Sequence, residues 1–297
     1  MTRLSFLLCL LFSAQLLLAQ SAKEILKQKT ERQLQNIVET SPFLTGMMAV
    51  DLTTGDSFSI NENLVFAQAS AIKIPILMEV YKQAHEKKFA LTDTRPLLIS
   101  NTVAGSGILN TMTDPVSLSI RNYAMLMIGL SDNSATNTLI DLVGMSNINN
   151  TMASLGMKNT RVQRKMIDQP ASLRNEENLS TPAEAVKIMK LLYEGNFIDK
   201  PASGEILSTL QKNSVENSKI AKGIPSNVKI AFKPGGMGGV STEWAVVYLA
   251  KRPYAVAIME NYKSGNSSQD VMASISKTLY EYYSRMAKAT NFGVILE

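Results

Sequence analysis

The chain has 297 residues, a formal net charge of +5, one histidine and one cysteine. Its lysines are scattered and no basic stripe is interleaved with aromatic residues, which argues against a nucleic-acid-binding protein. One histidine and one cysteine supply too few ligands for a zinc site, and no glycine-rich loop is typical of a phosphate-binding cradle, so we expect neither a metal nor another cofactor.

Residues 1–19 predict a secretory signal peptide. Arg3 supplies the positive charge, an apolar run too short for a comfortable membrane span follows, and Ala19 offers a small residue for cleavage. An uncleaved membrane anchor is the alternative interpretation. Because Cys9 lies inside the apolar run, the mature chain would contain no disulfide and would rely on its core alone. We therefore expect a periplasmic or secreted monomer without a stable membrane span after cleavage.

The predicted elements change in type along the mature chain, following helical and alternating periodicities and turn signals. In chain order, we expect a helix over 21–39, strands over 43–51 and 57–61, a long helix over 70–88, an irregular stretch over 92–116, helices over 118–130, 134–143 and 146–155, a loop over 161–180, helices over 182–193 and 203–212, strands over 228–232, 241–250 and 254–260, and a helix over 270–288.

This order predicts an α+β fold, an α/β sandwich with an inserted all-α subdomain. Two strands near one end of the chain and three near the other can complete a five-stranded antiparallel sheet, with the terminal helices covering one face. We expect residues 20–65 and 215–297 to form the α/β subdomain and residues 66–214 the helical one. A cleft between them would expose the start of the 70–88 helix, and such clefts are common sites of small-molecule chemistry.

The sequence Ser70-Ala71-Ile72-Lys73 places a hydroxyl and an amine three residues apart at that start, and positions i and i+3 share a helix face. Serine is a weak nucleophile until a base takes its proton. The one histidine, His85, lies in a charged stretch, so lysine is the more plausible base. The same spacing recurs at 226–229 and 274–277, so the motif alone is weak evidence.

Two further motifs follow in order, Ser131-Asp132-Asn133 and Lys233-Pro234-Gly235. Together the three resemble the penicillin-recognising serine enzymes, which comprise the class A β-lactamases and the penicillin-binding transpeptidases. The segment from Phe66 to Leu77 resembles the class A form in particular. Because the resemblance spans nearly the whole mature chain, it implies a β-lactamase/transpeptidase-like fold.

The resemblance implies a role for each motif residue. Ser70 would attack the β-lactam carbonyl and Lys73 would remove or relay its proton, which needs desolvation or a nearby cation because a free lysine has a pKa of about 10.4. Lys233 could supply that cation and attract the substrate carboxylate. Ser131 would pass a proton to the leaving nitrogen and Asn133 would bind the substrate's side-chain amide. The substrate-binding set is completed by Gly235, Gly236 and Thr242, with the backbone N–H groups of Ser70 and Gly236 forming the oxyanion hole.

The sequence departs from the family in the 161–180 loop. Class A enzymes carry there a glutamate that activates water for deacylation, and Met166 falls at its place and Pro170 at that of the following asparagine. A thioether cannot accept a proton, so Asp168 becomes the candidate base. Glu176 and Glu177 are expected to pair with Arg164 or with the following helix.

A second departure is Pro234, where the family has serine or threonine and a hydroxyl would contact the substrate carboxylate. Carboxylate binding then rests on Lys233 with Ser241 or Thr242. Three other residues have mainly structural interpretations. Asp132 would accept local backbone N–H groups, Asn137 would cap or pin a helix, and Trp244 would belong to the core.

These residues predict a serine β-lactamase that acts on a β-lactam or a peptidoglycan-like acyl-D-Ala-D-Ala substrate. One alternative is a penicillin-binding protein or D-Ala-D-Ala peptidase that deacylates slowly. Another is a non-catalytic periplasmic binding module, against which the four polar residues Ser70, Lys73, Ser131 and Lys233 argue.

Overall fold

The computed structural model describes residues 22–264, 270–290 and 292–296. The predicted signal peptide lies outside these ranges. Within them, none of the helices combines the length and the hydropathy that crossing a bilayer requires.

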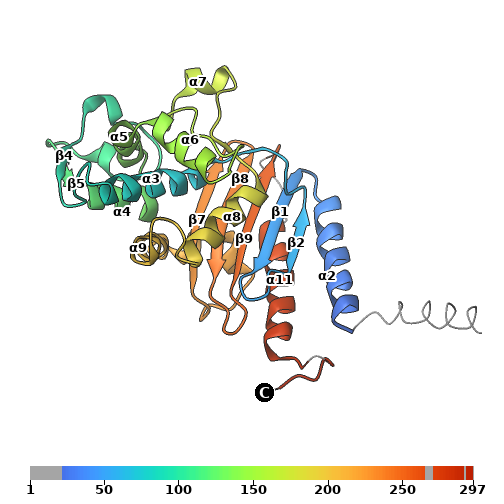
Figure 1. Cartoon of the computed structure of the whole chain (residues 1–297). Helices are drawn as coiled ribbons and strands as arrows, with labels where there is room; N and C mark the ends of the chain where they lie inside the picture. Colours follow the sequence, from blue (N-terminus) through green and yellow to red (C-terminus); the bar gives the residue numbers. More distant parts are fainter. Residues whose placement is uncertain (1–21, 265–269, 291, 297) are drawn as a thin grey trace, which may run out of the picture.

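A five-stranded sheet forms the centre of the molecule, with strand order β2-β1-β9-β8-β7 and antiparallel pairing throughout (Figure 1). It combines two strands from the N-terminal part of the chain with three from the C-terminal part, as predicted. Its strands are β1 (Leu44–Asp51), β2 (Ser57–Ile60), β7 (Ile230–Met237), β8 (Val240–Val247) and β9 (Tyr254–Asn261).

Strand β7 is longer than predicted. The sequence predicts a strand over 228–232, whereas β7 runs from Ile230 to Met237. Pro234 is tolerated because β7 is an edge strand, which need not donate every N–H to a neighbour. The residues after Lys233, up to Met237, therefore belong to the strand.

The terminal helices α2 (Ala22–Glu39) and α11 (Val271–Lys288) pack together on one face of the sheet, as predicted. Apolar side chains recurring at helical spacing, such as Leu34 and Ile275, meet Phe58 and Phe232 of the strands in one buried core. The opposite face is covered by α8 (Pro182–Tyr193), which contacts β1, β8 and β9 (Figure 1).

Five further helices form a second packed group beside the sheet (Figure 1). They are α3 (Lys73–His85), α4 (Ile120–Gly129), α5 (Asn133–Val143), α6 (Met145–Ser154) and α9 (Lys200–Leu210). Side chains that accept a backbone N–H three residues on begin several of them, for example Ser119 for α4 and Asp132 for α5. The boundaries of the two predicted subdomains stay a prediction.

Several short elements were not predicted from the sequence. The predicted loop over 161–180 contains α7 (Gln169–Leu173) and β6 (Leu179–Ser180), and β6 pairs with β3 (Phe66–Ala67) just before the Ser70 turn. The stretch predicted as irregular contains β4 (Thr94–Pro96), which pairs with β5 (Ser117–Ser119). Such short pairings carry no periodicity and depend on segments distant in sequence.

Candidate active site

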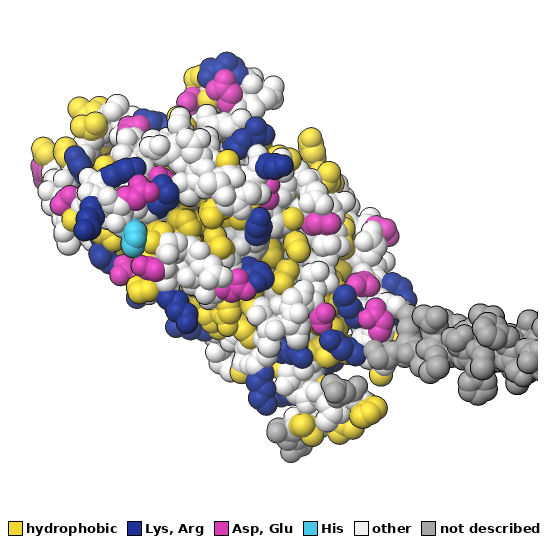
Figure 2. Space-filling view, in the orientation of Figure 1, with side chains coloured by type: hydrophobic (Ala, Val, Ile, Leu, Met, Phe, Trp, Pro, Cys, Tyr) yellow, Lys and Arg dark blue, Asp and Glu magenta, His cyan; other side chains and the backbone are white. Residues whose placement is uncertain are grey.

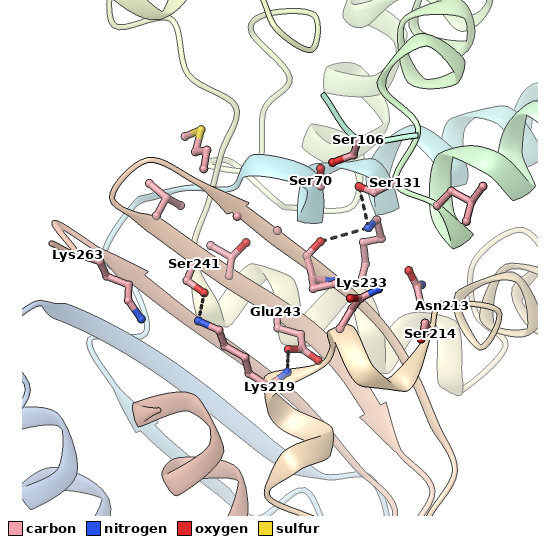
Figure 3. A pocket seen from close by; sticks show the side chains of 18 of the residues that line it. Ser70, Ser106, Ser131, Asn213, Ser214, Lys219, Lys233, Ser241, Glu243 and Lys263 are labelled. Carbon is pink, nitrogen blue, oxygen red and sulfur yellow. Dashed lines mark hydrogen bonds between the residues drawn. The ribbon is translucent and has the colours of Figure 1, made fainter. Parts of the chain in front are cut away.

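A cavity of about 760 Å³ opens where the helical group meets the edge strand β7 (Figure 3). Ser70, Ser131 and Lys233 line it, together with the predicted binding residues Gly235, Gly236 and Thr242. Lys73 and Asn133 lie directly behind Ser131, joined to it or to each other by hydrogen bonds. The fold thus gathers eight of the nine predicted site residues around one cavity, and Asp168 is not among its lining residues.

Ser70 lies in a 3₁₀ turn, Ala69–Ile72, that leads into α3, and not inside an α-helix as predicted. Ala69 has φ of 44° and Ser131 has φ of 53°, both in the left-handed region that non-glycine residues rarely adopt. Backbone strain of this kind persists where the surroundings fix it and is concentrated at functional sites. The unusual backbone thus occurs at Ser131 and directly before Ser70, in both cases just before a helix begins.

Strand β7 lies very close to the Ser70 turn. A Cβ atom added to Gly235 would stand 2.5 Å from the Gln68 carbonyl oxygen and 2.7 Å from the Ala71 nitrogen, so only glycine fits there. The Thr242 hydroxyl, on the neighbouring strand, donates a hydrogen bond to the same Gln68 oxygen at 2.9 Å. Turn and sheet are thereby fixed against each other on one side of the cavity.

Lys73 is fully buried, and its Nζ donates to Ser131 O at 2.6 Å, Ser131 Oγ at 3.1 Å and Asn133 Oδ1 at 3.0 Å. Burial, reinforced by the positive charge of Lys233, lowers the pKa of Lys73 well below its usual value. No hydrogen bond joins Lys73 Nζ to Ser70 Oγ, although both residues lie in the described part of the chain.

Lys233 reaches the same centre from the sheet. Its Nζ donates to Ser131 Oγ at 3.1 Å and to Pro234 O at 3.2 Å (Figure 3). Burial lowers the pKa of Lys233 to about 7, opposed by the charge of Glu243. Ser131 Oγ thus accepts from both lysines and keeps its own O–H as a hydrogen-bond donor.

Asp132 has the structural role expected from the sequence. Its carboxylate accepts the backbone N–H groups of Ile108 at 2.7 Å, Leu109 at 2.9 Å and Ala135 at 2.8 Å. It joins the loop before β5 to the start of α5. Ser131 and Asn133, on either side of Asp132, are fixed in place by these bonds.

The 161–180 loop is attached through Asn137 and Arg164. Asn137 accepts from Met166 N at 2.8 Å and donates to Met166 O at 3.3 Å, so it pins this loop and does not cap a helix. The Met166 side chain is buried in the helical core. Arg164 pairs with Glu177 at 2.8 Å, as predicted, whereas the other candidate partner, Glu176, pairs with Arg174.

Asp168 begins the short helix α7. Its Oδ1 accepts the backbone N–H of Ala171 at 3.1 Å, a capping interaction that the sequence interpretation did not include.

The His85 side chain is exposed at the end of α3, 3.8 Å from Asp199 and among charged side chains (Figure 2). The histidine therefore lies away from the cavity and is not a candidate base there.

Some cavity residues were missed by the sequence interpretation. Lys219 begins the four-residue helix α10 (Lys219–Lys222) and donates from Nζ to Ser241 Oγ at 2.8 Å (Figure 3). Glu243, on β8, is buried beside it. Neither belongs to a recognisable motif, and only the packing of α10 against the sheet brings them to the cavity.

Metal chemistry receives no support from side-chain clustering. Among the residues that the structure describes, no three histidine, cysteine or acidic side chains come together in a group that could hold a metal ion.

Comparison with known proteins gives a consistent result. The model of the beta-lactamase enzyme family matches residues 29–283. An imipenem-hydrolyzing beta-lactamase of Enterobacter cloacae is 24% identical over 245 residues, which cover 78% of this chain and 82% of that protein.

Solved structures agree with this. A beta-lactamase from Sphaerobacter thermophilus is 28% identical, with a TM-score of 0.78 over 86% of this chain and 97% of that one. A single-substitution variant of PBP-A, solved as an acyl-enzyme complex with penicillin G, is 23% identical, with a TM-score of 0.79 over 86% of this chain and 97% of that one.

Proposed function

Because the chain belongs to the beta-lactamase enzyme family, we propose that it is a serine hydrolase that opens the β-lactam amide through an acyl-enzyme on Ser70. The observation that carries the proposal is the arrangement of Ser70, Ser131 and two buried lysines around one cavity. The imipenem-hydrolyzing relative supports a β-lactam as the substrate.

In the proposed acylation, Ser70 Oγ forms a bond to the β-lactam carbonyl carbon and the ring C–N bond breaks. Lys73 accepts the serine proton in its neutral form, which burial favours and which has two N–H donors for the three acceptors around it. The Lys73 side chain must first turn from Ser131 O toward Ser70, and hydrogen bonds of this kind often form only in the substrate complex. Ser131 donates its hydroxyl proton to the leaving nitrogen and takes one in return from the Lys73 ammonium, whose Nζ lies 3.1 Å from Ser131 Oγ.

Two backbone N–H groups, of Ser70 and Gly236, are proposed to stabilise the oxyanion. Their separation depends on the close approach of β7 to the Ser70 turn, which the absence of a side chain at Gly235 permits. One such donor stabilises the transition state by roughly 3 kcal/mol.

The substrate carboxylate is proposed to bind between Lys233 and Lys219. Pro234 offers no hydroxyl, and the Thr242 hydroxyl is occupied by the Gln68 carbonyl. The Lys219 ammonium, half-buried and bonded to Ser241, lines the same cavity and supplies a second positive charge. Asn133, whose amide oxygen faces Lys73, is proposed to donate from its nitrogen to the substrate's side-chain amide.

The rate at which the acyl group is released distinguishes two candidate functions. In a β-lactamase, Asp168 would activate the water that releases the acyl group. A penicillin-binding protein or D-Ala-D-Ala peptidase would keep it longer, and one observation favours this second candidate. Met166 is buried at the position that the resemblance gives to a glutamate, while the Asp168 carboxylate caps α7. On the sequence of residues 1–19, we propose that either enzyme works in the periplasm or outside the cell.

Intact-protein mass spectrometry after mixing with benzylpenicillin tests the proposal. We expect one added acyl group that is lost in Ser70→Ala. A transient adduct with product turnover supports the β-lactamase, and a lasting one supports the penicillin-binding protein. An unmodified wild-type protein after prolonged incubation would reject serine acylation and favour the binding module.

A further inference from the structure

Glu243 is a carboxylate buried directly behind the edge strand of the cavity. It lies on β8 opposite Pro234 of β7 and is 1% exposed. Its oxygens accept the hydroxyl of Ser218 and the backbone N–H groups of Lys219 at 2.9 Å and Ile220 at 3.3 Å. Three consecutive residues are therefore bound to one side chain of the sheet.

Stability alone is a poor explanation for this carboxylate. Burial raises the pKa of Glu243 to about 7, which shows that the site disfavours its charged form. Buried charges of this kind contribute little net stability compared with apolar side chains of similar volume. The bonds that Glu243 accepts from Lys219, whose side chain lines the cavity, point instead to a role in positioning that segment.

The three bonds hold Lys219, whose side chain lines the cavity, and the residues on either side of it. Glu243 accepts from the backbone of Lys219, and Ser241, two residues away on the same face of β8, accepts from the Lys219 ammonium at 2.8 Å. The backbone and the tip of Lys219 are thus both held by one strand. A lysine side chain is otherwise flexible, and fixing it reduces the entropy that binding an anion costs.

We propose that Glu243 is a positioning residue that holds the Ser218–Ile220 segment against β8, so that the Lys219 ammonium meets the carboxylate of the substrate beside Pro234. The inference rests on the proposed function, in which the substrate carries a carboxylate next to the amide that is cleaved. In this role Glu243 acts through Lys219 and not on the reacting atoms.

Charged groups from neighbouring elements shape the same region. Lys233 of β7 is influenced by Glu243, and Lys219 is influenced by Glu260 of β9, by Lys263 and by Asp270. Lys263 is itself paired with Glu260, whereas the backbone N–H of Lys219 is bonded to Glu243.

Two probes separate this role from a general structural one. Benzylpenicillin carries the carboxylate, and its methyl ester lacks it. We expect Glu243→Gln, which keeps the shape of the side chain, to slow acylation by benzylpenicillin about tenfold, chiefly through weaker binding, and to change acylation by the ester less than twofold. Lys219→Met should act in the same way.

The two substitutions combined give the decisive measurement. If Glu243 works through Lys219, the double variant Glu243→Gln/Lys219→Met reacts with benzylpenicillin no more slowly than Lys219→Met alone. Glu243→Asp, which keeps a carboxylate, retains more of the wild-type rate than Glu243→Gln. Ser218→Ala, which removes one donor and no charge, should produce a smaller loss of the same kind and serves if Glu243→Gln folds poorly.

Glu79→Gln is the matched control, since Glu79 is also fully buried, accepts from Thr151 and Gln83, and lies away from the cavity. It should lower the melting temperature without discriminating between acid and ester. Equal losses with acid and ester in Glu243→Gln, additive losses in the double variant, or a rate that is unchanged or faster overturn the inference. A wild-type protein that neither probe acylates rejects the proposed function instead.

Discussion

Gly235→Ala should misplace the two halves of the proposed oxyanion hole. The added methyl carbon would stand 2.5 Å from the Gln68 oxygen, and β7 must move by about 0.9 Å to reach an ordinary contact of 3.4 Å. Two of the three nearest atoms, Gln68 O and Ala71 N, belong to the backbone, so turning the third, Thr242 Oγ1, away would not make enough room. A displacement of about 1 Å between a reacting group and its donors costs on the order of a hundredfold in rate.

We therefore expect Gly235→Ala to lower the second-order rate constant of acylation about a hundredfold. Overpacking of a tight site should also destabilise the fold by about 1–3 kcal/mol. Acylation is followed by quenched mass spectrometry with benzylpenicillin, and stability by thermal unfolding.

The control is Gly238→Ala, in the turn between β7 and β8, where an added Cβ meets no atom within 4 Å. It should keep the wild-type acylation rate. If Gly235→Ala acylates within threefold of the wild type while folded, the close approach of β7 does not set the catalytic geometry.

Three other predictions concern the loop and the pH dependence. Met166→Glu should shorten the lifetime of the acyl-enzyme about a hundredfold, because Asn137 already fixes the backbone at this position and a carboxylate there can activate water; an unchanged lifetime in a chase experiment would contradict this. Asp168→Asn should slow deacylation about tenfold and acylation less, and equal effects on the two steps would remove Asp168 from the mechanism. Because the pKa of Lys233 lies at about 7, its positive charge is lost as the pH rises through that value, so the KM for benzylpenicillin should increase above about pH 7. Lys233→Arg, which stays charged, should flatten this increase, and a flat wild-type profile would show that the charge of Lys233 is not needed for binding.

Local sequence patterns predicted most of the fold because they report on periodicity and chain reversal. The five strands, the terminal helices and the helices between them follow from apolar spacing and turn residues, and α8 over 182–193 begins and ends where it was expected. The boundaries failed where tertiary contacts override local preference. Strand β7 continues through Pro234 and two glycines because β8 pairs with it over its whole length.

The candidate site was likewise predictable in part. The order of three short motifs predicted that Ser70, Lys73, Ser131 and Lys233 belong together, since each residue type has a clear chemical use in acyl transfer. Their contacts were less predictable. Lys73 bonds to Ser131 and Asn133 instead of Ser70, and the Thr242 hydroxyl is engaged by the Gln68 carbonyl.

The sequence by itself therefore determined the family resemblance, the order of strands and helices, and the candidate residues for an acyl-enzyme, because these depend on residue type and spacing along the chain. Only the tertiary structure decided which charges face the cavity and how far each lysine is buried. Lys219 and Glu243 reach the cavity through the packing of α10 on the sheet, and the lowered pKa of Lys73 arises from burial and from a lysine distant in the sequence. Desolvation and proximity are properties of the folded chain, and no local pattern encodes them.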